Sequence, residues 1–265
     1  MSKKHDYLAV DIGNTHTVIG LFDSRHVLRH TWRVHTNRDI TAHELAVLLR
    51  GLLGLFGLGF ADVQALAAAS VVPSLVPVWK SMAEEYLKVN ALVIEVSDAL
   101  GMPIRYGRPY ELGADRIINA IAAFELYHQG LIVVDYGTAI TFDCISAKGE
   151  YLGGAIAPGI KLAADALASK TAKLPRLETF VMPEQVIAQD TLSALQTGLI
   201  LGFAGLTDGI VTRLIQEYET APKVIATGGL ASVIVPHTST VQEIAPELTL
   251  SGISIAYRRL QQNIT

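Results

Sequence analysis

Two aspartates, each ending an apolar run and each followed by a glycine turn, are the first candidates for chemistry. Asp11 stands in "LAVDIGNTHTVIGLFD" (8–23), and Asp135 stands in "LIVVDYGTAITFDCI" (131–145). A buried carboxylate is costly unless something satisfies it, so each aspartate either caps its turn or holds a ligand. Glycine turns present backbone N–H groups to phosphate oxygens, and an aspartate beside them can orient a hydrated magnesium or another cation. The pair therefore predicts a nucleotide site.

A third glycine turn, "TGG" at 227–229, fits the same interpretation. Glycine there would let an adenosine lie against bare backbone, because a side chain would collide with it. Other ATP-binding motifs are absent from the sequence. "GAIAPGIK" has Ile160 where a P-loop needs lysine, and neither H-R-D nor D-F-G occurs.

The segment "ELGADRIINAIAAFELYHQG" (111–130) predicts an anion site at the start of a helix. Its apolar residues recur at helical spacing, which places Gly113 to Arg116 at the N-terminal end. Free N–H groups and the helix dipole attract a carboxylate or phosphate there, and Arg116 can bind either one bidentately. Asp115 has two interpretations. A first-turn aspartate is ordinarily a cap, but beside an arginine in a cleft it can accept the proton of a substrate hydroxyl.

Alternating strands and helices must position these residues. The chain opens with an expected meander of three strands, 8–10, 18–22 and 27–34, and Thr41 then begins a helix with Glu44 at the capping-box position. Because the aspartate–glycine pattern recurs about one domain length later, we expect an α/β protein of two duplicated lobes, 1–129 and 130–265. Further strands are expected at 63–72, 91–96, 131–145 and 223–227, and further helices at 74–87, 192–218 and 250–261.

The composition favours a compact soluble protein without a nucleic-acid partner. Half of the 265 residues are apolar and the formal net charge is -4, whereas nucleic-acid binders carry a basic surplus. The uncharged stretches 63–79 and 191–207 contain prolines or glycines, so we expect them in buried cores rather than in a membrane. Cys144 is the only cysteine, which excludes an internal disulfide and a multi-cysteine metal site. No signal-peptide pattern precedes Asp11, which favours a cytoplasmic location.

Eight segments occur in the order typical of one enzyme family. They are "DIGNTHTVIGLFD", "ASVVP", "YELGADRIINA", "VVDYGTAITFDCI", "GEYLGGAIAPGI", "TAKLP", "TGGLA" and "LTLSGI". On these segments the chain resembles the type III pantothenate kinases of the actin-like (ribonuclease H-like) ATPase superfamily. The resemblance implies two actin-like lobes with mixed sheets flanked by helices, a homodimer, and phosphorylation of pantothenate to 4'-phosphopantothenate by ATP, the first step of coenzyme A synthesis. It also implies Mg2+ and a monovalent cation, potassium or ammonium.

The resemblance also assigns roles to individual residues. Asp115 resembles the family's general base, Asp135 its monovalent-cation ligand, and Asp11 a residue near the magnesium, directly or through water. The other implied ATP contacts are Ile12, Gly13, Asn14, Thr15, His16, Thr17, Val18, Thr138, Gly228 and Gly229. The implied pantothenate contacts are Tyr106, Gly113, Ala114, Asp115, Arg116 and Thr191. A loop role without a phosphate contact stays open for His16, and Thr191 follows Ala188 in "IAQDT", where the family usually has glycine.

Two other functions stay open at this point. One is a non-catalytic regulator, because some relatives are discussed as accessory transcription factors of the Bvg type. The intact Asp11, Asp115 and Asp135 and the lack of a DNA-reading module argue against it. The other is an actin-like kinase for another small hydroxy acid or a sugar. An anion site at Arg116 fits the carboxylate of pantothenate and suits a neutral sugar poorly.

Overall fold

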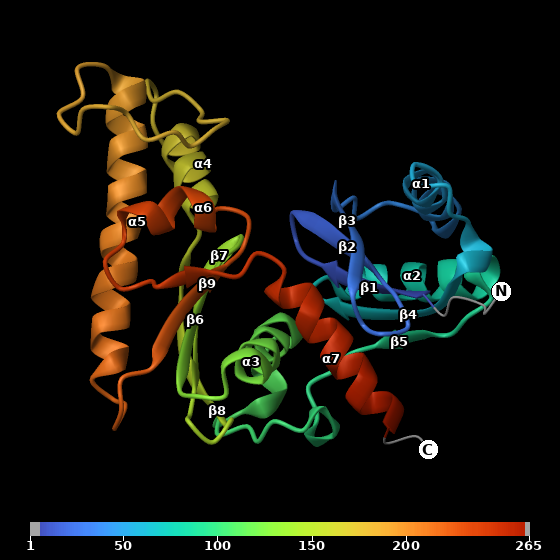
Figure 1. Ribbon diagram of the computed structural model, residues 1–265. Helices are drawn as coiled ribbons and strands as arrows, with labels where there is room; N and C mark the ends of the chain where they lie inside the picture. The colour runs from blue at the N-terminus through green and yellow to red at the C-terminus, as the bar shows by residue number, and fades with distance from the viewer. Residues whose placement is uncertain (1–5, 263–265) are drawn as a thin grey trace. The chain divides into compact units, whose positions relative to one another are not determined.

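In residues 6–262, which the computed structural model describes, the strands form two five-stranded sheets (Figure 1). The first sheet contains β1 (Asp6–Ile12), β2 (His16–Phe22), β3 (Leu28–His35), β4 (Val63–Ser70) and β5 (Ala91–Val93). The second contains β6 (Leu131–Tyr136), β7 (Ala139–Ile145), β8 (Tyr151–Pro158), β9 (Lys223–Thr227) and β10 (Glu243–Ile244). The helices are α1 (Ala42–Gly54), α2 (Val76–Met82), α3 (Ala114–Tyr127), α4 (Ile160–Lys170), α5 (Thr191–Ile215), α6 (Ala231–Ile234) and α7 (Leu248–Gln262).

The two sheets have the same topology. Their strand orders are β3-β2-β1-β4-β5 and β8-β7-β6-β9-β10. In the first, β1, β2 and β3 are antiparallel neighbours, and β4 and β5 continue the sheet in parallel. In the second, β6, β7 and β8 are antiparallel, and β9 and β10 continue in parallel. This correspondence confirms the predicted mixed sheets and explains why the aspartate–glycine turn occurs twice.

The described residues divide into two compact units, which are not two continuous halves of the chain. Residues 6–102, 108–122 and 249–262 form the first unit, and residues 103–107 and 123–248 form the second. The C-terminal helix α7 packs within the first unit, because the Cβ-less Gly252 lies against the backbone of Ile118 in α3. The compact units therefore differ from the expected division into 1–129 and 130–265.

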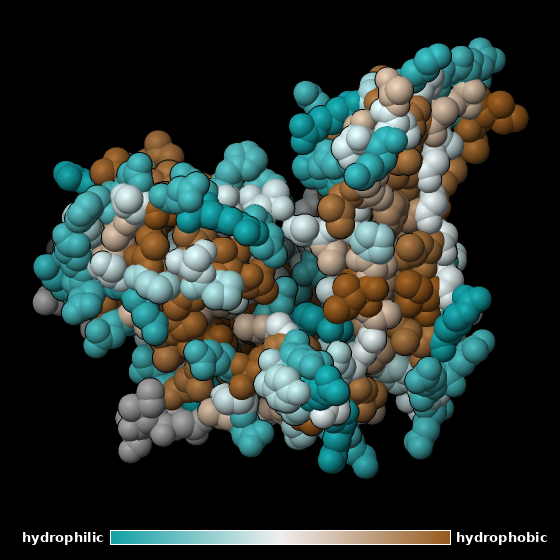
Figure 2. All heavy atoms as spheres, turned by 180° about the vertical axis from the view of Figure 1, so that it is seen from behind, coloured by the Kyte–Doolittle hydropathy of each residue, from teal (hydrophilic) through white to brown (hydrophobic). Residues whose placement is uncertain are grey.

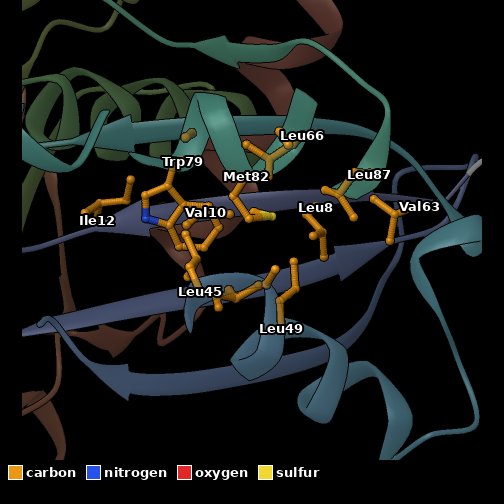
Figure 3. Close-up of a cluster of buried hydrophobic side chains, with 14 of the residues drawn as sticks. Leu8, Val10, Ile12, Leu45, Leu49, Val63, Leu66, Trp79, Met82 and Leu87 are labelled. Atoms are coloured by element: carbon orange, nitrogen blue, oxygen red, sulfur yellow. The ribbon is translucent and has the colours of Figure 1, made fainter. Parts of the chain in front are cut away.

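Alternating side chains build the core of the first unit (Figure 3). Leu8, Val10 and Ile12 lie on one face of β1, as the two-residue period of a strand requires. Leu45 and Leu49, four residues apart on α1, pack in the same cluster. Burial of a leucine or isoleucine side chain contributes roughly 1.5–3 kcal/mol relative to exposure. This packing holds β1, and therefore the turn that follows it, in place.

The capping box predicted at the start of α1 is present. The Glu44 N–H donates to Thr41 Oγ1 at 3.3 Å, and the Thr41 N–H donates to Glu44 Oε2 at 2.8 Å. The next predicted helix, 74–87, is less regular, with a 3-10 turn at Pro73–Leu75, α2, and a π-helical turn at Ala83–Leu87. Proline has no N–H to donate, so the prolines of this segment fit only at the start of a helical turn.

The long helix α5 covers the second sheet with one face only. Leu199, Phe203 and Val211 are among its buried residues and pack with the strands of that unit. Gly198, Gly202 and Gly205 are exposed, and nothing lies within 4 Å of a Cβ added at Gly198, Gly202 or Gly205. By length and composition α5 could cross a membrane. Of its apolar 18-residue stretch, 33% is buried inside the structure. The expectation of a buried core is thus correct for one face of the helix.

The exposed face of α5 is visible as surface. Figure 2 shows brown and white atoms along the edge of the second unit that this helix forms. Leu192, on the first turn of α5, is 48% exposed. A long helix with an uncovered stripe of small and apolar residues is a candidate contact surface.

Candidate active site

The turn between β1 and β2 is closed by its own backbone. The Gly13 N–H donates to the His16 carbonyl at 3.1 Å, and a Cβ at Gly13 would lie only 2.8 Å from that oxygen, so the turn requires glycine. Asp11 is half-buried near the end of β1 and pairs with Val18 of β2. Ile12 is fully buried in the core, so only its backbone can face a ligand. The predicted ATP contacts 11–18 therefore lie on one strand–turn–strand unit.

Side chains of this turn are engaged with β3 and the segment that follows it. The His16 ring stacks on His35, with 5.0 Å between ring centroids, and its Nδ1 accepts a hydrogen bond from Arg33 at 3.1 Å. Because an arginine only donates, Nδ1 of His16 carries no proton in this arrangement. Asn14 Oδ1 accepts from Arg38 at 2.8 Å. The His16 side chain thus has structural contacts, which keeps the loop-only interpretation open.

The start of α3 brings Gly113, Asp115 and Arg116 together. The Gly113 carbonyl accepts the Ile117 N–H at 3.4 Å, so this glycine occupies the capping position. Asp115 is the second residue of the helix, and its Oδ1 accepts the Arg116 N–H at 2.9 Å. A Cβ at Gly113 would overlap that carboxylate oxygen, so a larger residue at 113 would require the Asp115 side chain to move. Ala114 between them is half-buried.

The electrostatics of this helix start suit an acid–base role. Burial raises the pKa of Asp115, and the N–H and charge of Arg116 oppose that shift only in part. The Arg116 residue is only 7% exposed. A carboxyl group whose pKa moves toward neutrality beside a buried cation is a usual sign of a functional site. An arginine and a carboxyl group adjacent in the chain supply an anion binder and a proton acceptor.

In the second unit, Asp135 lies between two glycine turns. It is half-buried near the end of β6, opposite Thr141 of β7 and Thr227 of β9. A Cβ at Gly228 would meet its Oδ1 and the backbone of Tyr136, and Gly228 has a φ of +94°. Glycine is therefore required at 228 for close packing of the turn against β6. This reason differs from the expected contact with adenosine, and the ATP roles of Gly228 and Gly229 stay predictions.

Thr138 lies exposed in the turn between β6 and β7. Its carbonyl accepts the Gly159 N–H at 3.1 Å, and a Cβ at Gly159 would overlap that carbonyl oxygen. Gly159 directly precedes α4, so the N-terminal end of this helix borders the turn. Helix N-termini favour anions, so this neighbour supports a phosphate-binding role for the turn.

Tyr106 and Thr191 lie elsewhere in the second unit. The half-buried Tyr106 ring meets Tyr151 edge to face, with 6.2 Å between centroids, and packs on Gly153. Thr191 is the exposed first residue of α5, preceded by the N-cap Asp190, whose Oδ1 accepts the Ser193 N–H at 2.9 Å. Among the described contacts, none joins either residue to the Asp135 turn.

Two buried polar residues near these elements were not singled out from the sequence. Asn119 is 1% exposed, one turn after Asp115, and its Oδ1 accepts from Thr249 Oγ1 at 2.8 Å. Asp143 is fully buried in β7 and accepts from the Tyr151 hydroxyl at 2.8 Å. Each stands in an apolar run, and a polar residue there signals a buried hydrogen bond. That signal alone does not separate a structural residue from a ligand contact.

No group of three or more histidine, cysteine, aspartate or glutamate side chains gathers within residues 6–262. The carboxylates of Asp11 and Asp135 are oxygen donors, which suit hard cations. Magnesium usually keeps several waters and takes its other ligands from phosphates, so the single carboxylate of Asp11 fits such an ion.

Comparisons with known proteins agree on one family. Residues 7–213 match the family model described as type III pantothenate kinase. A type III pantothenate kinase of Anaeromyxobacter sp. is 47% identical over 252 residues, covering 95% of this chain and 98% of that protein. One of Syntrophotalea carbinolica is 46% identical with the same coverage. One of Geotalea uraniireducens is 44% identical, again over 252 residues.

Solved structures resemble the fold at low sequence identity. A Campylobacter jejuni protein described as a Baf family transcriptional activator has a TM-score of 0.57 at 21% identity, covering 97% of this chain and 98% of that chain. Component A of the Acidaminococcus fermentans (R)-2-hydroxyglutaryl-CoA dehydratase has a TM-score of 0.56 at 13% identity, covering 98% and 100%. These likenesses show an actin-like fold alone. The sequence matches over nearly the whole chain go further, and this chain belongs to the type III pantothenate kinase family.

Proposed function

We propose that this protein phosphorylates pantothenate to 4'-phosphopantothenate with ATP, the first step of coenzyme A synthesis. Its membership of the type III pantothenate kinases carries this proposal. The start of α3 supports it chemically, because a buried arginine and a carboxyl group of raised pKa lie side by side there. Pantothenate carries both a carboxylate and a primary hydroxyl. Arg116 binds the carboxylate, with Gly113, Ala114, Tyr106 and Thr191 as further contacts, and Asp115 accepts the hydroxyl proton.

The glycine turns bind ATP. Phosphoryl transfer depends mainly on positioning and on neutralising the phosphate charge, so the two turns and the cations supply most of the acceleration. The proposed ATP contacts of the first unit are Asp11 and residues 12–18. Those of the second unit are Thr138, Gly228 and Gly229. Asp11 orients Mg2+, and Asp135 binds potassium or ammonium. The carboxylate oxygens at both turns fit such ions.

The protein is a cytoplasmic homodimer in this proposal. The exposed glycines of α5 support a contact between two copies, because helices approach closely where side chains are small. The Campylobacter jejuni protein described as a Baf family transcriptional activator is only 21% identical, so its description assigns no regulatory role to this chain.

A coupled assay of ADP release tests the proposed activity. ADP should appear only when pantothenate is added, and the rate should be higher in potassium or ammonium buffer than in sodium buffer. Mass spectrometry should find one phosphate added to pantothenate. ADP release that is independent of pantothenate, or faster with a neutral sugar of similar size, would remove the assignment.

A further inference from the structure

We propose that Thr36, just after β3, is a positioning residue for the β1–β2 turn and thereby for ATP binding. The proposal rests on the proposed function, which makes that turn the first phosphate loop. Thr36 itself belongs to neither set of predicted ligand contacts. Two of its polar groups, the side-chain hydroxyl and the backbone N–H, bind to this one turn.

The hydroxyl groups form a directed chain. Thr36 Oγ1 donates its single proton to the Gly13 carbonyl at 2.7 Å. Thr36 Oγ1 also lies 2.9 Å from Thr17 Oγ1, so in that second bond it must accept, and Thr17 donates. Thr17 is only 4% exposed. Buried hydroxyls that are fully hydrogen-bonded fix the groups they touch, since an unmade bond there is costly.

The backbone of Thr36 forms a second hydrogen bond to the turn. Its N–H donates to the Thr15 carbonyl at 3.0 Å. Thr36 therefore holds the carbonyls of both Gly13 and Thr15, the residues on either side of Asn14. Two residues later, Arg38 donates to Asn14 Oδ1 at 2.8 Å, so the same segment also holds the tip of the turn.

These hydrogen bonds determine where the backbone N–H groups of the turn point, and a bound phosphate needs those N–H groups as donors. In a trans peptide the C=O and the next residue's N–H point in opposite directions. With the Gly13 carbonyl turned toward Thr36, the Asn14 N–H is aimed away from Thr36. The Thr15 carbonyl aims the His16 N–H in the same way. Thr36 thus orients two amides of the turn without any need to touch the nucleotide.

Thr36→Val and Thr36→Ser separate this role from simple packing. Valine keeps the shape and removes the hydroxyl, whereas serine keeps it. We expect Thr36→Val to raise KM for ATP about tenfold, because the loss of such a hydrogen bond costs about that factor. KM for pantothenate should change less than about twofold. Thr36→Ser should return KM for ATP to within about threefold of the original protein.

Thr31→Val is the matched control, because Thr31 is an exposed threonine of β3, the strand that ends one residue before Thr36, and the kinetic constants of this variant should not change. If Thr36→Val does not fold, Thr36→Ala removes the same hydroxyl in a smaller side chain and should raise KM for ATP by a similar factor. An unchanged KM for ATP in Thr36→Val, or an equal loss in Thr36→Ser, overturns the inference. Original protein that lacks pantothenate-dependent turnover contradicts the proposed function instead.

Discussion

Asp115 can be a helix cap or a general base, and asparagine distinguishes the two roles. Asparagine has nearly the same size and caps helices as well as aspartate does, but it cannot accept a proton. We expect Asp115→Asn to lower kcat on the order of a hundredfold or more, with thermal stability retained. Steady-state kinetics with circular dichroism melting measures both. A loss below about tenfold would reduce Asp115 to a cap.

The direction of the Asp115 pKa shift predicts two pH effects. Burial raises this pKa, and a base acts only when ionised, so kcat should fall as pH drops through the raised pKa.

The same shift affects stability, because the folded state holds the Asp115 proton more tightly than the unfolded chain does. Stability from this group is therefore full at low pH and is lost as pH rises through the folded pKa. Asp115→Asn should flatten the pH–rate profile and be more stable than the original protein at pH 8, in urea unfolding. An unchanged profile would contradict a base at this position.

Asp135 should determine the response to monovalent cations. We expect Asp135→Asn to lower turnover in potassium to the level that the original protein shows in sodium, because the carboxylate is the proposed ligand. Titration of potassium at constant ionic strength measures the effect. Asp165→Asn is the control, since the described contacts of the Asp165 carboxylate are surface ion pairs with Lys161 and Arg176. A variant that keeps full activation by potassium would exclude this role.

The sequence located the glycine turns correctly but explained only part of them. The turn at Gly13 was expected to present N–H groups to a phosphate, and Gly228 to leave room for adenosine. In the structure, Gly13 also accommodates the His16 carbonyl, and Gly228 accommodates Asp135 and Tyr136. Such close approaches depend on which strands are neighbours, and one turn read alone does not give that. For the same reason Thr36 gave no signal, because its partners are 19 or more residues away.

At the scale of elements, two helical glycines should respond oppositely to alanine. Alanine is a better helix former than glycine by about 1 kcal/mol. Gly51 of α1 has nothing within 4 Å of an added Cβ, so Gly51→Ala should stabilise the protein by up to about that amount. An added Cβ at Gly252 of α7 would overlap the Ile118 carbonyl, so Gly252→Ala should destabilise by roughly 1–3 kcal/mol. Urea unfolding measures both. The same sign for both would contradict this packing of α7 on α3.

Local signals predicted elements best where chain neighbours decide them. The opening meander, the Thr41 capping box and the helix at 250–261 all agree with the structure within a few residues. The strand expected at 91–96 ends at Val93, and the helix expected at 74–87 divides into a 3-10 turn, α2 and a π-helical turn. The strand is shorter because its pairing with β4 ends at Val93, and the helix is interrupted where Pro73 and Pro77 occur. The pairing of β1 with β4 decides how far the sheet extends, and no local pattern contains it.

At the scale of the whole molecule, the repeat predicted the topology but not the extent of the compact units. A repeated turn marks where each sheet begins, so duplicated strand orders follow from it. It says nothing of where the last helix packs, and α7 joins the first unit through Gly252 and Tyr257. The packing of a terminal helix depends on its apolar face and on which sheet face is uncovered.

The exposed glycines of α5 lead to a prediction about assembly. Gly198, Gly202 and Gly205 lie on one open face, four and three residues apart, where a second copy can approach closely. Light scattering after gel filtration should give twice the chain mass of 28.5 kDa. Gly202→Leu should give the single-chain mass and stay folded, because leucine blocks the approach while it favours the helix. Gly51→Leu, at an open glycine of α1, should remain a dimer. A monomeric original protein, or an unchanged mass for Gly202→Leu, would exclude this face as the dimer contact.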